Sequence, residues 1–243
     1  MENRIIAIIP FYNVRNFIGQ CYNSLISQQY DNYKLYFLDD CSNDETLELV
    51  EEKKKIIKVR RKKRGYALKN IQELLTAEHL DDDDIILFVD GDDYLHHPRV
   101  FERINAIYNE TKCLLTYGQY CTESGQEGHC SAYVKEEFER LRAFDWKASH
   151  LKTFRFSLYR SFLEQDPCLK AYKDENDLFY TMTYDVALMY PLMEIAGYEN
   201  IYFNKEVLYV YRIHSFNDMS INREQQITFE KHIRSKRPFK RVF

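Results

Sequence analysis

The sequence predicts an α/β protein whose core is a parallel, doubly wound sheet. Strand-like apolar runs alternate with amphipathic stretches through the first hundred residues, which implies parallel strands joined by right-handed crossovers. Three runs end in polar or aromatic turns, at residues 10–12, 39–40 and 90–93, and such folds bind ligands at this edge of the sheet. At 243 residues, the chain can form one large domain or one domain with an elaborated lobe.

The elements of the first half are recognised by their apolar patterns. Continuous apolar runs are typical of strands buried on both faces, and they occur at residues 5–10, 34–40, 56–59 and 85–90. Apolar residues at helical spacing predict helices over residues 16–29, 42–52 and 66–80, and a further amphipathic stretch begins near Pro98. Ser42 is a suitable N-cap for the second of these helices, because acidic residues follow it in the first turn.

The pattern loosens beyond about residue 113. We expect a strand at 113–121, a polar loop at 122–132, mixed helix and loop at 134–165, a helix at 184–196 interrupted or restarted at Pro191, and a late strand at 206–214. This change divides the chain into two expected parts, residues 1–112 and residues 113–243.

Composition indicates a soluble, intracellular protein, which we expect in the cytoplasm. No segment reaches 18 apolar residues, and the apolar run near the N-terminus is too short for a signal peptide or a membrane span. The net charge of −4 gives no reason to expect non-specific nucleic-acid binding. The six cysteines lack CxxC spacing, which favours free thiols in a reducing compartment; they are Cys21, Cys41, Cys113, Cys121, Cys130 and Cys168.

Two segments are strongly basic. Residues 53–64 hold nine Lys and Arg and could mimic a nucleic-acid patch, but the apolar residues among them favour a short strand with solvated flanks. Residues 231–241 hold six, and we expect a solvated tail, with contact to an anionic membrane surface as the alternative.

Three carboxylates lie within four residues at the end of the fourth expected strand, in FVDGDDYL (88–95): Asp90, Asp92 and Asp93. A divalent cation removes their mutual repulsion, because Mg²⁺ and Mn²⁺ take oxygen ligands and keep positions open for phosphates. The alternative is an acidic turn in which Asp92 caps the next helix. The chain has neither a GxGxxG dinucleotide motif nor a GxxxxGK[ST] phosphate loop, so phosphate charge must be neutralised differently.

Several segments in this order resemble the family 2 glycosyltransferases of the GT-A fold: IIPFYN, SLISQQ, LDDCSNDET, RGYALKN, FVDGDD, a later Asp-bearing helix and YRIH. The likeness is close over residues 3–110 and looser over 180–215. It implies a Rossmann-like, mostly parallel central sheet flanked by helices. The nucleotide-sugar-binding half would span residues 1–112, and the C-terminal lobe at 113–243 would bind the acceptor.

The resemblance implies that five residues hold the nucleotide. The ring of Tyr12 would stack on the base, with Pro10 shaping the turn, and Asp40 would accept the N3–H of uracil. Arg64 and Asn70 match the basic-plus-Asn segment that the family carries at the next helix. For Tyr12, the alternative is a packing role.

The resemblance also implies a cation, Mn²⁺ or Mg²⁺, at the carboxylate cluster. One of Asp90, Asp92 and Asp93 would bind the ribose hydroxyls and another the cation, and we favour Asp92 as the metal contact. His214 in YRIH resembles a late histidine that approaches the metal or the diphosphate in related enzymes. A purely structural histidine is the alternative.

In the second lobe, residues 146–162 resemble an HLRTFR-type segment of related transferases. Trp146 would stack on a sugar face, with His150 and Arg155 near the acceptor or the diphosphate; structural roles are the alternative for all three.

The catalytic base belongs to a Glu-Asp pair that opens a helix in related enzymes. The corresponding pair here is Tyr184–Asp185, so Asp185 is the candidate base. Asp174 and Asp177 lie close by in the sequence and stay open as alternatives.

The implied function is transfer of a hexose from a UDP-sugar to a sugar, peptide or lipid acceptor, dependent on a metal and with inversion at the anomeric carbon. A sugar-nucleotide nucleotidyltransferase and a catalytically inactive scaffold are the alternatives. The first expects a glycine-rich segment after the first strand, which FYNVRNFIG does not supply, and the second expects an eroded Asp cluster.

Overall fold

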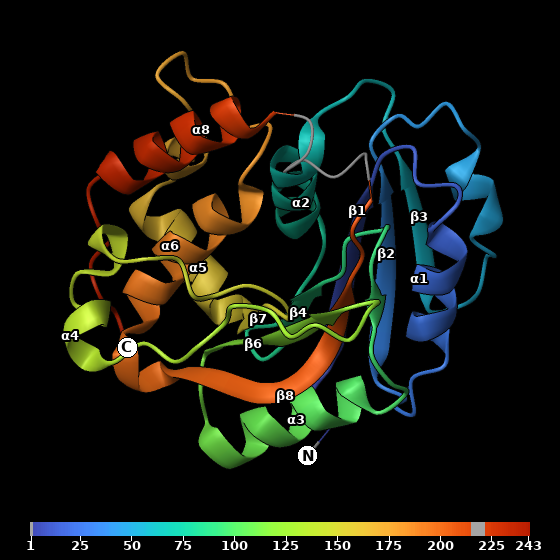
Figure 1. Cartoon of the computed structure of the whole chain (residues 1–243), viewed down its shortest axis with the longest axis horizontal. Helices are drawn as coiled ribbons and strands as arrows, with labels where there is room; N and C mark the ends of the chain where they lie inside the picture. Colours follow the sequence, from blue (N-terminus) through green and yellow to red (C-terminus); the bar gives the residue numbers. More distant parts are fainter. Residues whose placement is uncertain (1, 215–221) are drawn as a thin grey trace.

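The computed structural model describes residues 2–214 and 222–243. Its described residues form an eight-stranded sheet in the order β3-β2-β1-β4-β7-β6-β8-β5 (Figure 1). β1 lies between β2 and β4, and β2 pairs with β3, all in parallel. The strands are β1 (Ile5–Phe11), β2 (Tyr33–Asp39), β3 (Ile56–Arg60), β4 (Ile85–Phe88), β5 (Tyr94–Leu95), β6 (Leu115–Thr122), β7 (Thr153–Arg155) and β8 (Ile201–Tyr211). The predicted α/β class is confirmed.

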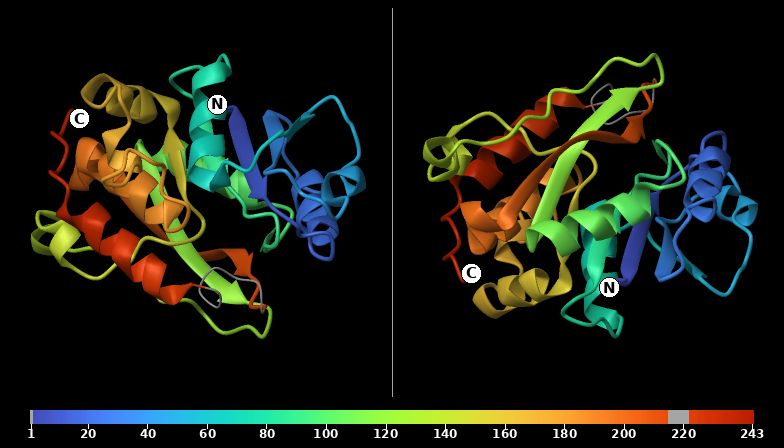
Figure 2. Two further views of the ribbon diagram at one scale, coloured as in Figure 1. Left: turned by 90° about the horizontal axis from the view of Figure 1, so that it is seen from above. Right: turned by 90° about the horizontal axis from the view of Figure 1, so that it is seen from below.

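Helices cover both faces of the sheet (Figure 2). The α-helices are α1 (Ile18–Ile26), α2 (Tyr66–Ala77), α3 (Val100–Thr111), α4 (Lys135–Phe138), α5 (Phe156–Gln165), α6 (Tyr184–Ala196) and α8 (Arg223–Ser235). Successive side chains of a strand point to opposite faces. In β1, Ile6 and Ile8 therefore pack with α2, α5 and α6, whereas Ile5, Ala7 and Ile9 pack with α1 and α3.

The helix expected over residues 42–52 is wrong; the structure has only a 3₁₀ turn, Thr46–Leu49. The polar side chains that look like a helix start bind the turn after β1 instead. Ser42 Oγ accepts a hydrogen bond from the backbone N–H of Asn13 at 3.0 Å, and Asp44 Oδ2 accepts one from that of Arg15 at 3.0 Å. These side chains therefore make hydrogen bonds that join the ends of β1 and β2 instead of capping a local helix.

The expected break at Pro191 is also wrong, since α6 runs unbroken from Tyr184 to Ala196. Proline removes one backbone donor and normally kinks or ends a helix. Here Pro191 lies in a helix that is buried from Val186 onward on nearly every side, so packing against α5 and α8 holds the helical path. Apolar residues all round a helix are typical of a core helix.

Two short strands, β5 and β7, were not predicted. β7 has three residues and pairs antiparallel with both β4 and β6, and β5 has two residues and pairs with β8. The late strand was predicted but begins at Ile201 rather than at residue 206. Strands this short carry no readable period, so their existence depends on the partners that the fold brings to them.

The basic tail is not a solvated segment throughout. α8 includes part of it, and Ile233 is 1% exposed. The ammonium of Lys236 donates to the backbone oxygens of Lys170 at 2.5 Å and Lys173 at 2.6 Å, and burial lowers its pKa. Part of the tail's positive charge is therefore bound by the chain itself. Among the described residues, no helix combines the length and the apolar character that spanning a bilayer requires.

Candidate functional site

The three turns predicted to meet at the sheet edge do meet. The backbone N–H of Asp40 donates to the carbonyl of Phe11 at 2.9 Å, and that of Gly91 donates to the carbonyl of Pro10 at 3.1 Å. The turn after β1 therefore lies between the turns after β2 and β4. At Gly91, a Cβ would lie 2.5 Å from the Cβ of Phe11, so the close approach of the two turns requires glycine there.

The guanidinium of Arg64 stacks on the ring of Tyr12 at this edge. The guanidinium carbon of Arg64 is 3.8 Å from the centre of the Tyr12 ring and 4.6 Å from that of Tyr66. Its Nε is 3.6 Å from Asp40 Oδ2. The structure thus brings three of the predicted nucleotide-binding residues together, and one face of Tyr12 already carries a planar cation.

Asp40 anchors the loop that leads into α2. Its carboxylate accepts hydrogen bonds from the backbone N–H groups of Gly65 at 2.6 Å and Tyr66 at 2.9 Å, and from Asn70 Nδ2 at 2.8 Å. Asp40 is 4% exposed and Asn70 is 3% exposed. At Gly65, a Cβ would lie 2.6 Å from Asn70 Oδ1, so this loop also depends on glycine.

Two of the three clustered carboxylates bind the protein itself. Asp90 Oδ1 accepts the hydroxyl of Tyr184 at 2.6 Å. Asp93 Oδ2 accepts the hydroxyl of Tyr209 at 2.7 Å, and its Oδ1 accepts the backbone N–H of Arg212, also at 2.7 Å. Burial raises the pKa of Asp90 to about 6 and raises that of Asp93 well above its ordinary value. These contacts join the end of β4 to α6 and β8.

The third carboxylate faces the late histidine. Asp92 Oδ2 lies 2.9 Å from His214 Nε2, although 122 residues separate them in the sequence. The imidazole stacks on Phe17 with 4.5 Å between ring centres. The guanidinium of Arg212 donates to the backbone oxygen of Asp92 at 2.8 Å, which ties the histidine-bearing segment to the carboxylate turn. One carboxylate oxygen and one imidazole nitrogen facing each other form a donor set that suits Mn²⁺.

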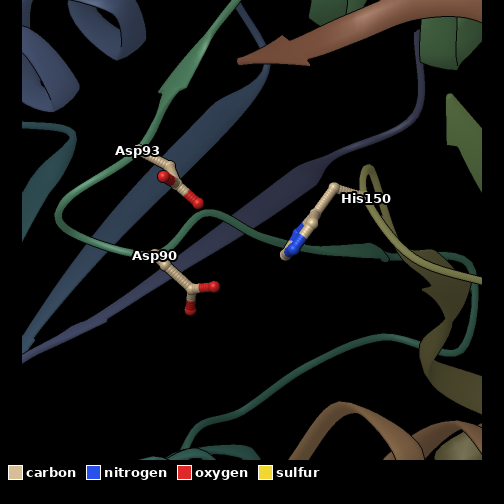
Figure 3. Close-up of side chains that lie close together, drawn as sticks. All are labelled: Asp90, Asp93 and His150. Carbon is tan, nitrogen blue, oxygen red and sulfur yellow. The ribbon is translucent and has the colours of Figure 1, made fainter. Parts of the chain in front are cut away.

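A second group with possible ligand atoms lies beside the first. One ligand atom each from Asp90, Asp93 and His150 lies within 4.8 Å of the other two, and Figure 3 shows the three side chains gathered around one space. The imidazole of His150 stacks on Tyr209 with 4.4 Å between ring centres. Burial, the nearby Lys152 and His129 hold the pKa of His150 well below its ordinary value, so this imidazole is neutral.

Comparison with known proteins identifies the family. The family model described as "Glycosyl transferase family 2" matches residues 6–166, about two thirds of the chain. The chain belongs to glycosyl transferase family 2. Glycosyltransferase GlyA of Streptococcus pneumoniae is 24% identical over 223 residues, which cover 88% of this chain and 31% of that protein. The poly(ribitol-phosphate) beta-N-acetylglucosaminyltransferase TarS of Staphylococcus aureus is 32% identical over 97 residues, 37% of this chain and 16% of TarS.

Solved structures support the GT-A fold of this family 2 chain. S. aureus TarS has a TM-score of 0.64 at 19% identity, covering 87% of this chain and 37% of TarS. The mannosyltransferase PcManGT of Pyrobaculum calidifontis, in complex with GDP-Man and Mn²⁺, has a TM-score of 0.61 at 15% identity, covering 98% of this chain and 66% of that one. The chain spans about a third of the length of GlyA and of TarS.

Two second-lobe expectations for this family 2 chain do not fit the geometry. Arg155 pairs with Ile85 at the start of β4, the end away from Asp90, and its guanidinium donates to Asn3 Oδ1 at 2.8 Å. It therefore lies away from the carboxylate turn. Trp146 is half-buried and packs edge-on against Tyr190 with 5.0 Å between ring centres, and its Nε1 is buried, so the ring packs against the core instead of standing open as a sugar platform.

The candidate bases lie in different surroundings. Asp185 is in the first turn of α6, next to Tyr184. Burial contributes most to the raised pKa of Asp90, followed by the charge of Asp92 and then by that of Asp185. Asp177 is exposed and paired with Lys170 at 2.5 Å and Lys173 at 3.5 Å. The lysines lower the pKa of Asp177, which makes it a weak proton acceptor.

Sequence reasoning missed four residues of this site. Tyr184 had been noted only as a departure from the Glu-Asp pair, and Arg212 lies in the YRIH motif, so both carried a readable signal. Lys152 lies in the 146–162 segment that resembles the HLRTFR type, so it also carried a signal, whereas Tyr209 lies in a strand-like run whose pairing partner could not be read from the chain.

Proposed function

We propose that this chain is a metal-dependent, inverting glycosyltransferase that moves a hexose from a UDP-sugar to a sugar, peptide or lipid acceptor. The Asp92–His214 pair, next to the edge that carries Tyr12, Arg64 and Asp40, is the observation that carries the proposal. TarS, whose structures in complex with UDP and with UDP-GlcNAc have TM-scores of 0.62 and 0.61, also matches this chain in sequence at 32% identity over 97 residues, which supports UDP as the nucleotide.

In the proposed site, Asp92 and His214 would hold Mn²⁺ or Mg²⁺. The cation would stabilise the negative charge of the leaving diphosphate. Tyr12 and Arg64 would hold the base, and Pro10 would shape the turn beneath it. Asp40 and Asn70 would fix the loop that presents Arg64, since both are nearly fully buried. Both oxygens of Asp40 already accept hydrogen bonds from this loop and from Asn70, so this proposal does not include the expected contact of Asp40 with the N3–H of uracil. Asp90 and Asp93 would hold the carboxylate turn, with Asp90 beside the ribose.

Further features support a wider description. The six cysteines are free, which supports a reducing compartment such as the cytoplasm. We divide the roles between residues 1–112, which would bind the donor, and residues 113–243, which would bind a carbohydrate or glycoconjugate acceptor.

A donor-hydrolysis panel tests the function. The protein is incubated with Mn²⁺ and a set of UDP- and GDP-sugars, and released nucleotide is measured. We expect UDP release from at least one UDP-sugar and its loss when EDTA removes the cation. Pyrophosphate formation from UTP and a sugar phosphate would instead indicate a nucleotidyltransferase, and no turnover of any kind would indicate an inactive scaffold.

Tyr12→Ala is expected to weaken UDP binding roughly 10- to 100-fold, because an aromatic platform stabilises a base by about 1–3 kcal/mol. With one face of the ring stacked on Arg64, the base would either take the other face or displace the guanidinium. Isothermal titration calorimetry with UDP and Mn²⁺ gives the affinity. Tyr12→Phe should bind like wild type, and a large loss there would assign the effect to the hydroxyl.

A further inference from the structure

Two tyrosines from distant parts of the chain hold Asp90. The backbone N–H of Asp90 donates to the hydroxyl of Tyr209 at 3.2 Å, and the hydroxyl of Tyr184 donates to its carboxylate oxygen Oδ1 at 2.6 Å. Among the residues that the structure describes, none donates a hydrogen bond to the other oxygen, Oδ2. The main chain of Asp90 is therefore held by β8, and its carboxylate is held by one hydroxyl from α6.

The hydroxyl of Tyr184 comes from a rigid element. Tyr184 is the first residue of α6, and every residue of this helix from Val186 to Met193 is buried. A side chain on a packed helix has a fixed anchor, so this hydroxyl holds the Asp90 carboxylate in one orientation. Tyr184 stands where the resemblance to the family places a glutamate, and an ionised glutamate has no hydrogen to donate to a carboxylate.

The open oxygen of Asp90 lies between the two parts of the proposed donor site. The turn after β4, from which Asp90 and Asp93 project (Figure 3), lies directly against the turn that carries Tyr12. A nucleotide with its base on Tyr12 and its diphosphate at Asp92 would place its ribose between the two turns. Both oxygens of Asp93 already accept hydrogen bonds, whereas Oδ2 of Asp90 is open. A carboxylate oxygen without a donor is suited to accept a ribose hydroxyl.

We propose that Tyr184 is a positioning residue for the donor: its hydroxyl holds Asp90 by Oδ1, so that Oδ2 accepts a hydroxyl of the ribose. The site thereby selects ribonucleotides over deoxyribonucleotides. This inference rests on the proposed function for the place of the nucleotide. The helix that carries the candidate base, α6, then also shapes the donor site.

Selectivity for the ribose hydroxyls tests the inference on the full chain. Calorimetric titration with Mn²⁺ compares UDP with 2′-deoxy-UDP and with 3′-deoxy-UDP, and the ratio of the affinities is the readout. In the wild type, we expect one of the two deoxynucleotides to bind about 10-fold or more weakly than UDP, because it lacks a hydrogen bond to a charged group. In Tyr184→Phe, this ratio should fall towards one, because the carboxylate is no longer held in one orientation.

Tyr36→Phe is the matched control. The hydroxyl of Tyr36 donates to Glu78 Oε2 at 2.7 Å, just beyond the last residue of α2, so this variant loses the same kind of hydrogen bond outside the site. Its ratio should equal that of the wild type. Asp90→Ala should lower the ratio as Tyr184→Phe does, and adding Tyr184→Phe to it should change the ratio no further. If Tyr184 only stabilised the fold, its replacement would lower the Tm and leave the ratio unchanged.

Three results would overturn the inference. The first is a wild type that binds UDP and both deoxynucleotides alike, and the second is a folded Tyr184→Phe protein with the wild-type ratio. The third is an equal loss of affinity for all three nucleotides in Tyr184→Phe, which would assign Asp90 to the cation instead of the ribose. Should Tyr184→Phe not fold, as judged by circular dichroism, Asp90→Ala decides, and a wild-type ratio there overturns the inference.

The outcomes also separate this inference from the proposed function. The expected ratios without UDP release from any UDP-sugar would contradict the proposed function and leave the role of Tyr184 standing. Transfer of a sugar with an unchanged ratio in Tyr184→Phe would contradict the role of Tyr184 alone. A wild type that binds no UDP would contradict both.

Discussion

Asp92→Ala is expected to lower transfer activity about 10³-fold or more and to remove the Mn²⁺-dependent part of the UDP affinity. Stabilisation of a leaving diphosphate by a cation is worth several kcal/mol, and each ~1.4 kcal/mol is a factor of ten. The fold should stay nearly intact. The variant loses the contact between Asp92 and His214, but it also loses the repulsion between Asp92 and the neighbouring carboxylates, and the second effect offsets the first. Turnover, UDP titration with Mn²⁺ and thermal unfolding measure the three effects.

Asp93→Ala is the matched comparison, one residue along the same turn. It leaves the hydroxyl of Tyr209 and the backbone N–H of Arg212 without their acceptor, both of them buried, and should cost about 1–3 kcal/mol of unfolding free energy for each group. We therefore expect Asp93→Ala to lower the Tm clearly and Asp92→Ala to leave it close to wild type. Unchanged Mn²⁺-dependent UDP affinity in Asp92→Ala would remove this residue from the proposed cation site.

Asp185→Asn is expected to lower turnover by about 10²-fold or more while UDP and Mn²⁺ still bind. Inverting transfer needs one carboxylate on the acceptor side to take the proton of the attacking hydroxyl, and general-base catalysis contributes about 10²–10⁴-fold. Asparagine keeps the shape of the side chain and cannot accept that proton. Steady-state turnover and calorimetric titration separate the loss of chemistry from a loss of binding.

Asp177→Asn is the control for the base. Its carboxylate is exposed and paired with two lysines, so we expect near-normal turnover in this variant. The reverse outcome, with Asp177→Asn inactive and Asp185→Asn active, would move the base to Asp177. If Asp185 interacts only with the dipole of α6, its replacement should lower the unfolding free energy by at most about 1 kcal/mol. The Tm should then fall slightly, and turnover should stay unchanged.

Much of the sheet edge that carries Tyr12, Asp40 and the carboxylate turn could be predicted from the chain. The apolar runs that became β1, β2 and β4 were readable, and parallel strands place their carboxyl ends at one edge. The meeting of Tyr12, Asp40 and the carboxylate turn therefore followed from local pattern. The expected helix at residues 42–52 failed because its polar side chains bind the turn after β1, a contact between separate segments.

The second half depended on contacts between distant segments. His214 was placed near the cation by resemblance, and the structure brings it to Asp92 across 122 residues. No pattern in the sequence predicted that the hydroxyls of Tyr184 and Tyr209 donate to two of the clustered carboxylates. Such pairings depend on how β8 and α6 pack against the first four strands.

Residues 152–155 show where local pattern stops and the tertiary structure decides. The chain itself determined that an apolar and basic segment follows His150, and that its side chains alternate between two faces if it is extended. The sheet decided its direction: β7 runs antiparallel to β4, with Thr153 opposite Leu87 and Arg155 opposite Ile85. Lys152 therefore lies at the end of β4 that carries Asp90, and Arg155 lies at the other end. A three-residue strand has too few hydrogen bonds of its own to set its direction, so the strands already paired around it set it.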